Sequence, residues 1–522
     1  MHESWINHLV IAPLLLPLLI GTLLLLARRT LSLTIRRTFN LAAILGQLIL
    51  AVELLLLVSD GTILTYRLGH WPAPWGIVLV ADRLAVWMLL VTALLAFFAL
   101  LHAMQGTDRR SRHFHPLFQL QLLGLNGAFL TGDLFNLFVF FEILLLASYG
   151  LLVHGGGAAR VRAGLHFVVI NLIGSTLFLF AAGALYGLVG TLNLADLSLK
   201  LAHLPPEHLG PARIAALLLL TVFALKAALV PLHLWLPAAY AATAAPVAAL
   251  FAIMTKVGAY ALLRVETLLF GTHAGILSGL YPAWLLPLGL LTLVLGALGA
   301  LAASTVRRQI AYLVVVSVGL LLTAFGLGTA AGIAAGLYYL VHTTFATAAF
   351  FLLADLIRRQ RGALSDRLQP GPALPNARLL GGLFFITALL VAGLPPFSGF
   401  IGKFLILRAA LAAPDWPWLV GIVLVTGLLG IIALARVGSL LFFHIRGAGS
   451  GAATHPLPQP GYFRAALPTI GLLTLCLALL IGAGPLLNFT DATAAQLLNP
   501  HEYIHAVLKP IGIQFAPEEF AP

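Results

Sequence analysis

Long apolar segments recur along the whole chain and are separated by short polar loops. A helix that crosses a bilayer needs about 20 predominantly apolar residues. Fourteen segments reach this length, so the pattern predicts an all-α, polytopic membrane protein with about 14 transmembrane helices. The predicted segments are residues 6–27, 39–59, 78–104, 115–131, 133–153, 163–189, 213–238, 243–270, 284–303, 308–326, 332–357, 377–408, 416–444 and 464–487.

Composition supports this class and excludes several others. The 522 residues are 61% hydrophobic and only 9% charged, whereas soluble domains carry about 25% charged residues. Cys476 is the single cysteine, so no internal disulfide is possible and no cysteine metal site is indicated. The chain contains no GxxxxGK[ST], paired CxxC or HExxH motif. We therefore expect no cofactor and no metal.

The basic residues are scattered in short loops, so the net charge of +12 reflects the topology of the chain. We therefore expect no nucleic-acid partner. With the first loop in the cytoplasm, 18 lysines and arginines fall in cytoplasmic loops, 6 fall outside and 5 lie within helices. This asymmetry follows the positive-inside rule and predicts both termini outside. Arg28 and Arg29 follow the first apolar run instead of preceding it, which indicates a retained helix, not a signal peptide.

Two apolar segments contain a lysine beside helix-breaking prolines. Residues 226–237 read KAALVPLHLWLP, and residues 394–403 read LPPFSGFIGK. Proline removes a backbone donor, so the seventh and twelfth helices are predicted to be broken. Their spacing of five helices predicts an inverted repeat, an arrangement typical of transporters. The predicted divisions are 1–114 (helices 1–3), 115–270 (first repeat), 271–444 (second repeat) and 445–522 (cytoplasmic loop, helix 14 and a short tail).

Glu142 and Lys226 interrupt two apolar helices and are predicted to form a pair. A charge buried alone in apolar surroundings is neutralised, whereas two opposite charges together can stay ionised. Ionisable residues at membrane depth usually serve function. The pair can act as a switch that releases a proton when it opens. The alternative is a static ion pair that joins two helices.

Three further residues are candidates for a proton relay. Lys256 lies on a helix face with Tyr260, one turn later. His342 is followed by two threonines, and histidine titrates near neutral pH. Lys403 follows the second proline break, where Ser398 and two glycines leave room for water. Packing alone is the competing explanation for His342, and snorkelling to the surface is the competing explanation for Lys403.

Other polar positions are assigned accessory or structural roles. His233, inside the first break, and Tyr260 and Ser398 are possible accessory groups. We expect Glu53, Arg264 and Arg436 to be structural or to contact other subunits, with Arg264 near Glu266 or snorkelling to the surface. Glycines 155–157 predict a cytoplasmic turn, not a phosphate cradle.

The segment KAALVPLHLWLP, followed by APVAAL and KVGAY, resembles the proton-translocating, antiporter-like membrane subunits. Mrp-type multisubunit cation/proton antiporters, respiratory complex I and membrane-bound hydrogenases share these subunits. The resemblance spans the fourth to thirteenth helices. FFEILLLASYGLLVHGGG (140–157) and AGLPPFSGFIGK (392–403) are most similar to the D-type subunits of Mrp (Pha) antiporters.

The resemblance implies fourteen helices with an inverted five-helix repeat. It also implies roles: Glu142 and Lys226 as the charged pair, Lys256 as the relay, His342 as the bridging site and Lys403 as the terminal lysine. Many relatives carry a lysine shortly after this histidine, but here Phe345, Ala346 and Thr347 follow. The long lateral helix of the largest antiporter-like subunit of complex I is absent, as are the extra C-terminal helices of the large A-type subunit of Mrp antiporters.

The chain is therefore predicted to carry protons in a Na⁺(monovalent cation)/H⁺ antiporter complex of the bacterial cytoplasmic membrane, with other antiporter subunits, protons, Na⁺ and lipid as partners. It is not expected to be an enzyme. An axis of lysines repels sodium, and only Glu53 and Glu142 are acidic deep in the membrane, so sodium is expected to cross elsewhere. The alternatives are a proton-pumping subunit of a redox complex and a passive scaffold with vestigial charges.

Overall fold

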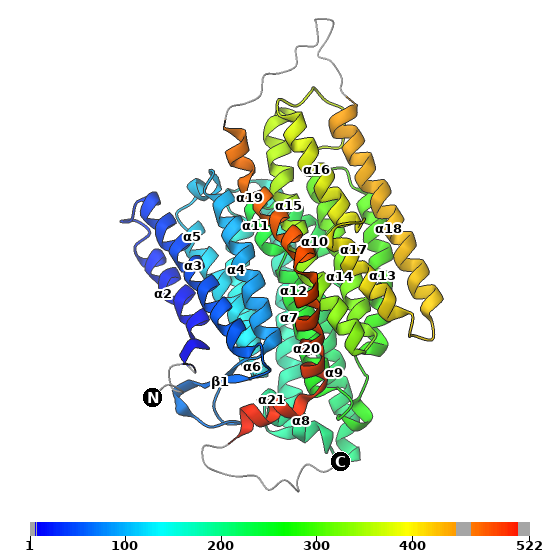
Figure 1. Ribbon diagram of the computed structural model, residues 1–522. Coiled ribbons are helices and arrows are strands. Elements are labelled where there is room, and N and C mark those ends of the chain that lie inside the picture. The colour runs from blue at the N-terminus through cyan, green and yellow to red at the C-terminus, as the bar shows by residue number, and fades with distance from the viewer. Residues whose placement is uncertain (1–5, 7, 445–460, 510–522) are drawn as a thin grey trace, which may run out of the picture.

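The computed structural model describes residues 6, 8–444 and 461–509, and most of this part of the chain is helical (Figure 1). Within these residues, 11 helices are long and apolar enough to cross a membrane, and two shorter apolar helices accompany them. The chain is thus a multi-pass membrane protein. The cytoplasmic loop predicted at the start of the 445–522 division and the end of the predicted tail lie mainly outside the described residues.

The N-terminal part contains a small sheet that the apolar pattern does not predict. Strands β1 (Leu64–Arg67) and β2 (Val78–Ala81) pair antiparallel, so the helix expected over 78–104 begins instead as a strand. The helix starts after Asp82, whose carboxylate accepts a hydrogen bond from the backbone N–H of Ala85 at 2.9 Å. The all-α prediction needs this correction. The helices of this part are α2 (Ala12–Leu26), α3 (Leu33–Val58) and α4 (Arg83–Ala103).

The middle part contains the first predicted break. Helix α9 ends at Ala227, and α10 does not begin until Trp235, because Pro231 lies between them. Ala228 terminates α9 in the left-handed region (φ 62°), which is uncommon for a residue with a side chain. The helices of this part are α5 (Phe114–Leu130), α6 (Leu134–Leu152), α7 (Ala158–Val189), α8 (Leu194–Ala202), α9 (Pro206–Ala227), α10 (Trp235–Ala242), α11 (Ala245–Phe251) and α12 (Met254–Leu269).

The C-terminal part contains the second break, between α16 and α17. Gly393 ends α16 in the left-handed region (φ 74°), and two prolines follow before α17 starts at Ser398. Helix α18 continues into a short π-helical turn (Ser439–Phe443). The helices here are α13 (Pro282–Ala302), α14 (Val306–Gly326), α15 (Ala330–Gln360), α16 (Ala377–Ala392), α17 (Ser398–Ala410), α18 (Trp416–Gly438), α19 (Tyr462–Ile481), α20 (Ala483–Leu498) and α21 (Pro500–Leu508).

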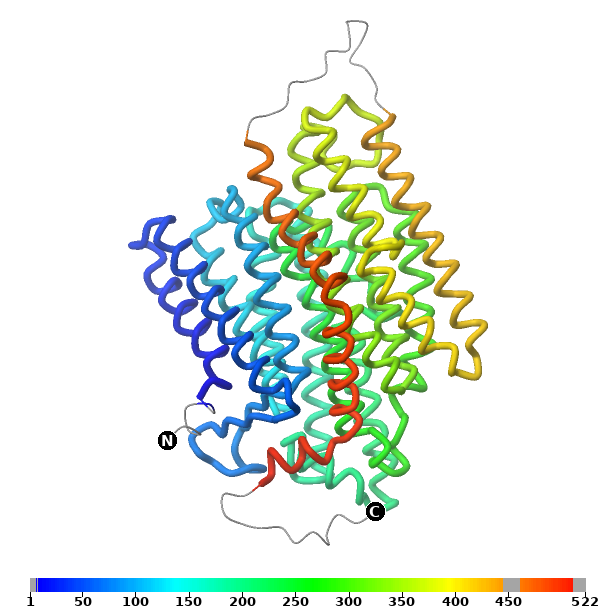
Figure 2. Tube along the Cα trace, viewed as in Figure 1, coloured from blue at the N-terminus to red at the C-terminus, as the bar shows by residue number. Residues whose placement is uncertain are grey.

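Helices α11, α12 and α15 form the centre of the bundle and are buried along their apolar windows. Helix α15 contacts α14, α16, α17, α19 and α20, and the last two cross the molecule along it (Figure 2). Helix α2 begins and α21 ends on the same side of the molecule, the side that carries β1 and α8 (Figure 1). The breaks in α9/α10 and α16/α17 therefore lie next to a buried core, where protein can satisfy the freed backbone groups.

A buried polar cluster joins the N-terminal helices near the loop between α4 and α5. Arg37 of α3 donates two hydrogen bonds, at 2.6 and 2.8 Å, to the carboxylate of Asp108. His115 Nε2 lies 3.3 Å from the same carboxylate, and its Nδ1 lies 2.8 Å from the Asn40 amide. Burial alone would raise the pKa of Asp108, but the bonds from His115 and Arg37 lower it from 3.8 to about 2.

The Asp108→Asn variant is expected to lose the part of the stability that, in the wild type, disappears as the pH falls. A carboxyl whose pKa is lower in the folded state stabilises the fold above its ordinary pKa and ceases to do so as the pH falls through the folded value. The gap in thermal midpoint between wild type and variant should be constant above about pH 5 and shrink toward pH 2. Thermal unfolding in detergent from pH 2 to 7 measures this gap. Asp415→Asn, at an exposed position, is the control, and a pH-independent Asp108 gap would contradict the assignment.

Candidate functional site

Glu142 of α6 and Lys226 of α9 both reach the same polar face of α7 and do not form an ion pair with each other. The Ser175 hydroxyl of α7 donates a hydrogen bond to Glu142 Oε1. One turn away, Asn171 Oδ1 of α7 accepts a hydrogen bond from Lys226 Nζ at 3.3 Å. The direct ion pair predicted from the sequence is therefore absent here, and each charged group instead has a hydrogen bond with a small polar side chain of α7.

The Lys226 ammonium has little access to solvent. Its residue is 6% exposed, and Nζ lies 6.0 Å from the centroid of the Phe141 ring on α6. Lys226 is in the last turn of α9, directly before the break, where the negative end of the helix dipole favours a cation. Among the described residues, its one hydrogen-bond partner is the neutral Asn171 amide. The site holds the lysine without a fixed counter-ion.

Lys256 of α12 lies beside the same break. A Cβ at Gly258 would lie 2.4 Å from the Ala227 nitrogen, so only glycine lets α12 come this close to the end of α9. Lys256 is completely buried, and its Nζ donates a hydrogen bond to Ser317 Oγ of α14 at 3.3 Å. Gly258 therefore packs directly against the backbone of Lys226 and Ala227, and Lys256 precedes Gly258 by two residues on α12.

A small cavity connects the surroundings of Lys256 to those of the second break. Ser317, His342 and Lys403 all line it, together with the hydroxyl-bearing Thr343 and Thr347. About 30 Å³ of this cavity is open to water-sized particles, and one water molecule needs roughly 10–15 Å³. The cavity has hydroxyl, imidazole and ammonium groups among apolar side chains in its lining and is large enough for ordered water, so it can pass a proton from one polar group to another.

His342 and Lys403 are fixed by the second break itself. His342 Nδ1 lies 3.0 Å from Ser398 Oγ at the start of α17. A Cβ at Gly399 would lie 2.8 Å from His342 Nε2 and 2.1 Å from the Leu390 oxygen, so this glycine is needed for the close approach. Lys403 Nζ donates to the carbonyls that end α16, at 3.3 and 2.6 Å, where the helix dipole is negative.

The predicted accessory residues divide into two groups. Ser398 contacts His342 at the second break. His233 is buried in the first break, and its Nδ1 has no hydrogen-bond partner among the described residues. Tyr260 turns away from the cavity, because its hydroxyl donates to the Phe129 carbonyl at 2.6 Å and lies 3.4 Å from Arg264 Nε.

The charges predicted to be structural are placed as follows. Arg264 does not pair with Glu266, whose carboxylate accepts from the Tyr281 backbone N–H; it forms two hydrogen bonds to Asp82, at 2.6 and 2.7 Å. Glu53 is exposed on the outer face of α3. Arg436 is exposed near the end of α18 and donates to the Leu301 carbonyl at 3.0 Å.

Sequence reasoning missed the small polar residues that hold the relay. Asn171, Ser175 and Ser317 each interrupt an apolar helix and each face a charged partner. Their signal was present, since 171 and 175 are spaced by one helical turn within the predicted segment 163–189. A polar pair at this spacing in an apolar helix indicates one polar face, which a membrane protein turns inward.

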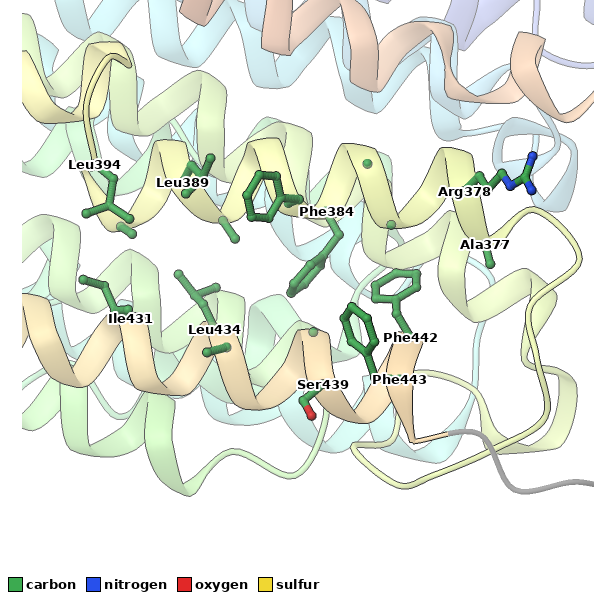
Figure 3. A pocket seen from close by; sticks show the side chains of 17 residues that line it. Ala377, Arg378, Phe384, Leu389, Leu394, Ile431, Leu434, Ser439, Phe442 and Phe443 are labelled. Carbon is green, nitrogen blue, oxygen red and sulfur yellow. The ribbon is translucent and has the colours of Figure 1, made fainter.

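A large apolar space among the described residues lies outside the relay. A groove of about 760 Å³ separates α16 from α18, and Figure 3 shows its walls of leucine, isoleucine and phenylalanine, with Arg378 at one end and Leu394 at the other. Only Ala392 and Leu434 line both this groove and the polar cavity. The groove's lining carries no titratable group besides Arg378, so it does not extend the relay.

The fold and the buried groups together define a class. Multi-pass helical proteins that bury lysines, a histidine and a carboxylate beside broken helices are membrane proteins that translocate ions.

Comparison with known proteins identifies the family within this class. Residues 131–430 match the family model described as "NADH:quinone oxidoreductase/Mrp antiporter, TM", and the chain belongs to this family. The D subunit of a probable K(+)/H(+) antiporter of Rhizobium meliloti (strain 1021) is 42% identical over 97% of this chain and 98% of its own. The D subunit of a Na(+)/H(+) antiporter of Alkalihalophilus pseudofirmus is 37% identical over 96% of this chain and 100% of its own.

A solved structure agrees with these relatives. A chain of the Mrp complex from Dietzia sp. DQ12-45-1b has a TM-score of 0.85 and 30% sequence identity, covering 96% of this chain and 99% of its own. The match spans almost the whole chain, including the N-terminal helices outside the family model. The predicted resemblance to the D-type subunits of Mrp antiporters is confirmed.

Proposed function

We propose that this chain is the proton-carrying subunit of a monovalent cation/proton antiporter complex. The observation that carries the proposal is the continuous series of contacts from Lys256 through Ser317 to the cavity lined by His342 and Lys403. Hydroxyl groups and ordered water can transfer a proton along this series. Helix α9, which carries Lys226, packs against α12, which carries Lys256, and Glu142 and Lys226 form the proposed switch.

The proton path supports a transporter more than an enzyme. Protons enter near the first break, pass Lys256 and His342, and leave past Lys403. A membrane potential contributes about 2.3 kcal/mol per charge per 100 mV, which is enough to drive exchange of a counter-ion. The redox-complex alternative is less well supported, because relatives 42% and 37% identical to this chain carry the names of antiporter subunits.

The exchanged cation takes a different route from the proton. Three lysines along the relay repel a metal cation, and Glu53, the other deep carboxylate, faces outward from α3. The two relatives carry different cations in their names, K⁺ and Na⁺. We infer that the cation, sodium or potassium, crosses at an interface with another subunit of the complex.

The proposed topology follows from the same proposal. Fourteen crossings form an N-terminal part (1–114), two inverted five-helix repeats (115–270 and 271–444) and a last segment (445–522). Both termini lie on the outer side of the bacterial cytoplasmic membrane, and the arginine-rich loops lie on its cytoplasmic side. The common side of the start of α2 and the end of α21 supports an even number of crossings (Figure 1).

Separate Lys226→Ala and Lys403→Ala variants test whether the chain carries protons or is a scaffold. Each removes a buried ammonium, so we expect cation-driven proton flux in reconstituted vesicles to fall to background while the complex still assembles. Lys200→Ala, at a solvent-facing lysine that pairs with Asp196 on α8, is the matched control and should keep full flux. Flux preserved in both buried-lysine variants would support the scaffold and overturn the proposal.

A further inference from the structure

We propose that a pocket on the side of the molecule opposite β1 and α8 binds a phosphate-type anion, either free phosphate or the phosphate of a lipid headgroup. The pocket has a volume of about 530 Å³. It lies between the loop after α4, the start of α7, the α10–α11 turn and the ends of α14 and α15 that meet there. Its charged lining residues are Arg110, Arg160, Arg307, Asp355, Arg358 and Arg359.

Positive charge exceeds negative charge in this pocket. The Asp355 carboxylate accepts from Arg358 at 2.7 Å and from Arg359 at 2.6 Å. Asp366, beside the pocket, accepts from Arg307 at 2.9 and 3.1 Å. Five guanidinium groups thus face two carboxylates, which leaves an excess of three positive charges.

Arg110 and Arg160 carry two of the three excess charges, and Arg358 and Arg359, which share the Asp355 carboxylate, supply the third. Arg160 donates to carbonyl oxygens, of which the Ala242 and His154 carbonyls are the nearest, at 3.0 and 2.8 Å, and these do not neutralise it. Arg110 is exposed and forms no hydrogen bond or ion pair with the described residues. Planar guanidinium groups without a carboxylate partner match the geometry of a phosphate, which they bind through parallel hydrogen bonds.

The glycine turn before α7 brings these two arginines together. A Cβ on Gly155 would lie 2.8 Å from Arg160 Nη1 and 3.2 Å from Arg110 Nη1, so the two nitrogens are within about 6 Å of each other. Gly155 also has a φ of +85°, which a residue with a side chain rarely adopts. Two like charges held this close are stabilised by an anion between them.

The backbone supplies a second attraction for the same anion. Gly157 caps α7 without any side-chain hydrogen bond, and the first residues of this 32-residue helix line the pocket. The free N–H groups and the positive end of the helix dipole favour an anion at this position. The sequence predicts a turn and not a phosphate cradle at glycines 155–157, and the proposal departs from that prediction, because the arginines that line the pocket come from four segments of the chain.

Arg110→Gln tests the site, because it removes a guanidinium that holds no other contact in place. The full complex, purified in detergent, is titrated with sodium phosphate and with sodium chloride at matched ionic strength while its thermal midpoint is followed. We expect a saturable rise with phosphate that chloride does not give. Arg110→Gln should weaken the apparent affinity about tenfold, the effect of losing one charge-assisted hydrogen bond. Arg109→Gln, at the exposed neighbour that does not line the pocket, is the matched control.

A lipid arm distinguishes the two sources of the phosphate. If phosphate stabilises the detergent-purified complex directly, the ligand is a free anion. If it does so only after delipidation, and anionic phospholipid co-purifies with wild type but is depleted in Arg110→Gln, the ligand is a headgroup. The proposal would be overturned if neither result is found, or if Arg109→Gln and Arg110→Gln weaken the apparent affinity for phosphate equally. The readouts are binding measurements, so the proposal can fail without affecting the proposed proton transport.

Discussion

Replacing Glu142 by glutamine is expected to abolish cation-driven proton flux while leaving the chain folded and assembled. Glutamine keeps the size of the side chain, and its carbonyl oxygen can accept the hydrogen bond that the Ser175 hydroxyl gives to Glu142. What the substitution removes is the negative charge, the nearest counter-charge that the relay offers to Lys226. Flux in reconstituted vesicles, measured with a pH-sensitive dye, checks the result.

Two matched variants separate the charge from its surroundings. Ser175→Ala keeps the carboxylate and removes one hydrogen bond, so we expect reduced but measurable flux. Glu53→Gln makes the same chemical change at an exposed carboxylate on α3, away from the lysines, and proton flux through the relay should persist. Full flux in Glu142→Gln would refute the charged-pair switch, whatever the other two variants show.

The structure changes how the switch must work. The sequence suggested a direct contact between Glu142 and Lys226, but Asn171 and Ser175 of α7 hold the two groups separately. Opposite charges separated by neutral side chains still attract each other in a protein interior. In the proposed switch, Lys226 keeps its proton when its ammonium meets the Glu142 carboxylate, and it passes the proton toward Lys256 when the two groups separate.

Apolar periodicity predicts much of the fold because the membrane demands it. Every spanning helix needs a long apolar run, and prolines mark the two interruptions near Pro231 and Pro396, which made these breaks visible. The β1–β2 sheet was not visible, because Val78–Ala81 is as apolar as the helix that follows and merges with it in the pattern. Length and hydropathy cannot separate a buried strand from a helix.

Contacts between distant segments could not be predicted. Lys256, His342 and Lys403 stood out because ionisable groups are costly in a membrane. Ser317 did not stand out, because a serine in an apolar helix can bond to its own backbone, and only the packing of α12 against α14 shows that it faces Lys256. The same limit applied to Arg264, whose partner, Asp82, is 182 residues away in the sequence.

The Asp82–Arg264 contact leads to the prediction with the largest expected effect on stability. Both residues are buried, 1% and 5% exposed, and they share two hydrogen bonds. Asparagine caps a helix about as well as aspartate, so Asp82→Asn preserves the start of α4 while it removes the charge and one of the two acceptors of Arg264. Arg264 is then left buried without a counter-charge, which costs about 3–5 kcal/mol of unfolding free energy.

A double-mutant cycle tests that this cost comes from the pair and not from either residue alone. Arg264→Met, which keeps the apolar stem and removes the guanidinium, strands the Asp82 carboxylate instead and should also destabilise the chain. In the double variant neither charge is left unpaired, so the loss should be smaller than the sum of the two single losses by at least ~1 kcal/mol. Denaturant titration in detergent micelles provides these free energies, with Asp60→Asn as the exposed control. Additive losses would mean that the two residues stabilise the protein independently, and that the β2–α4 junction is anchored to α12 by packing alone.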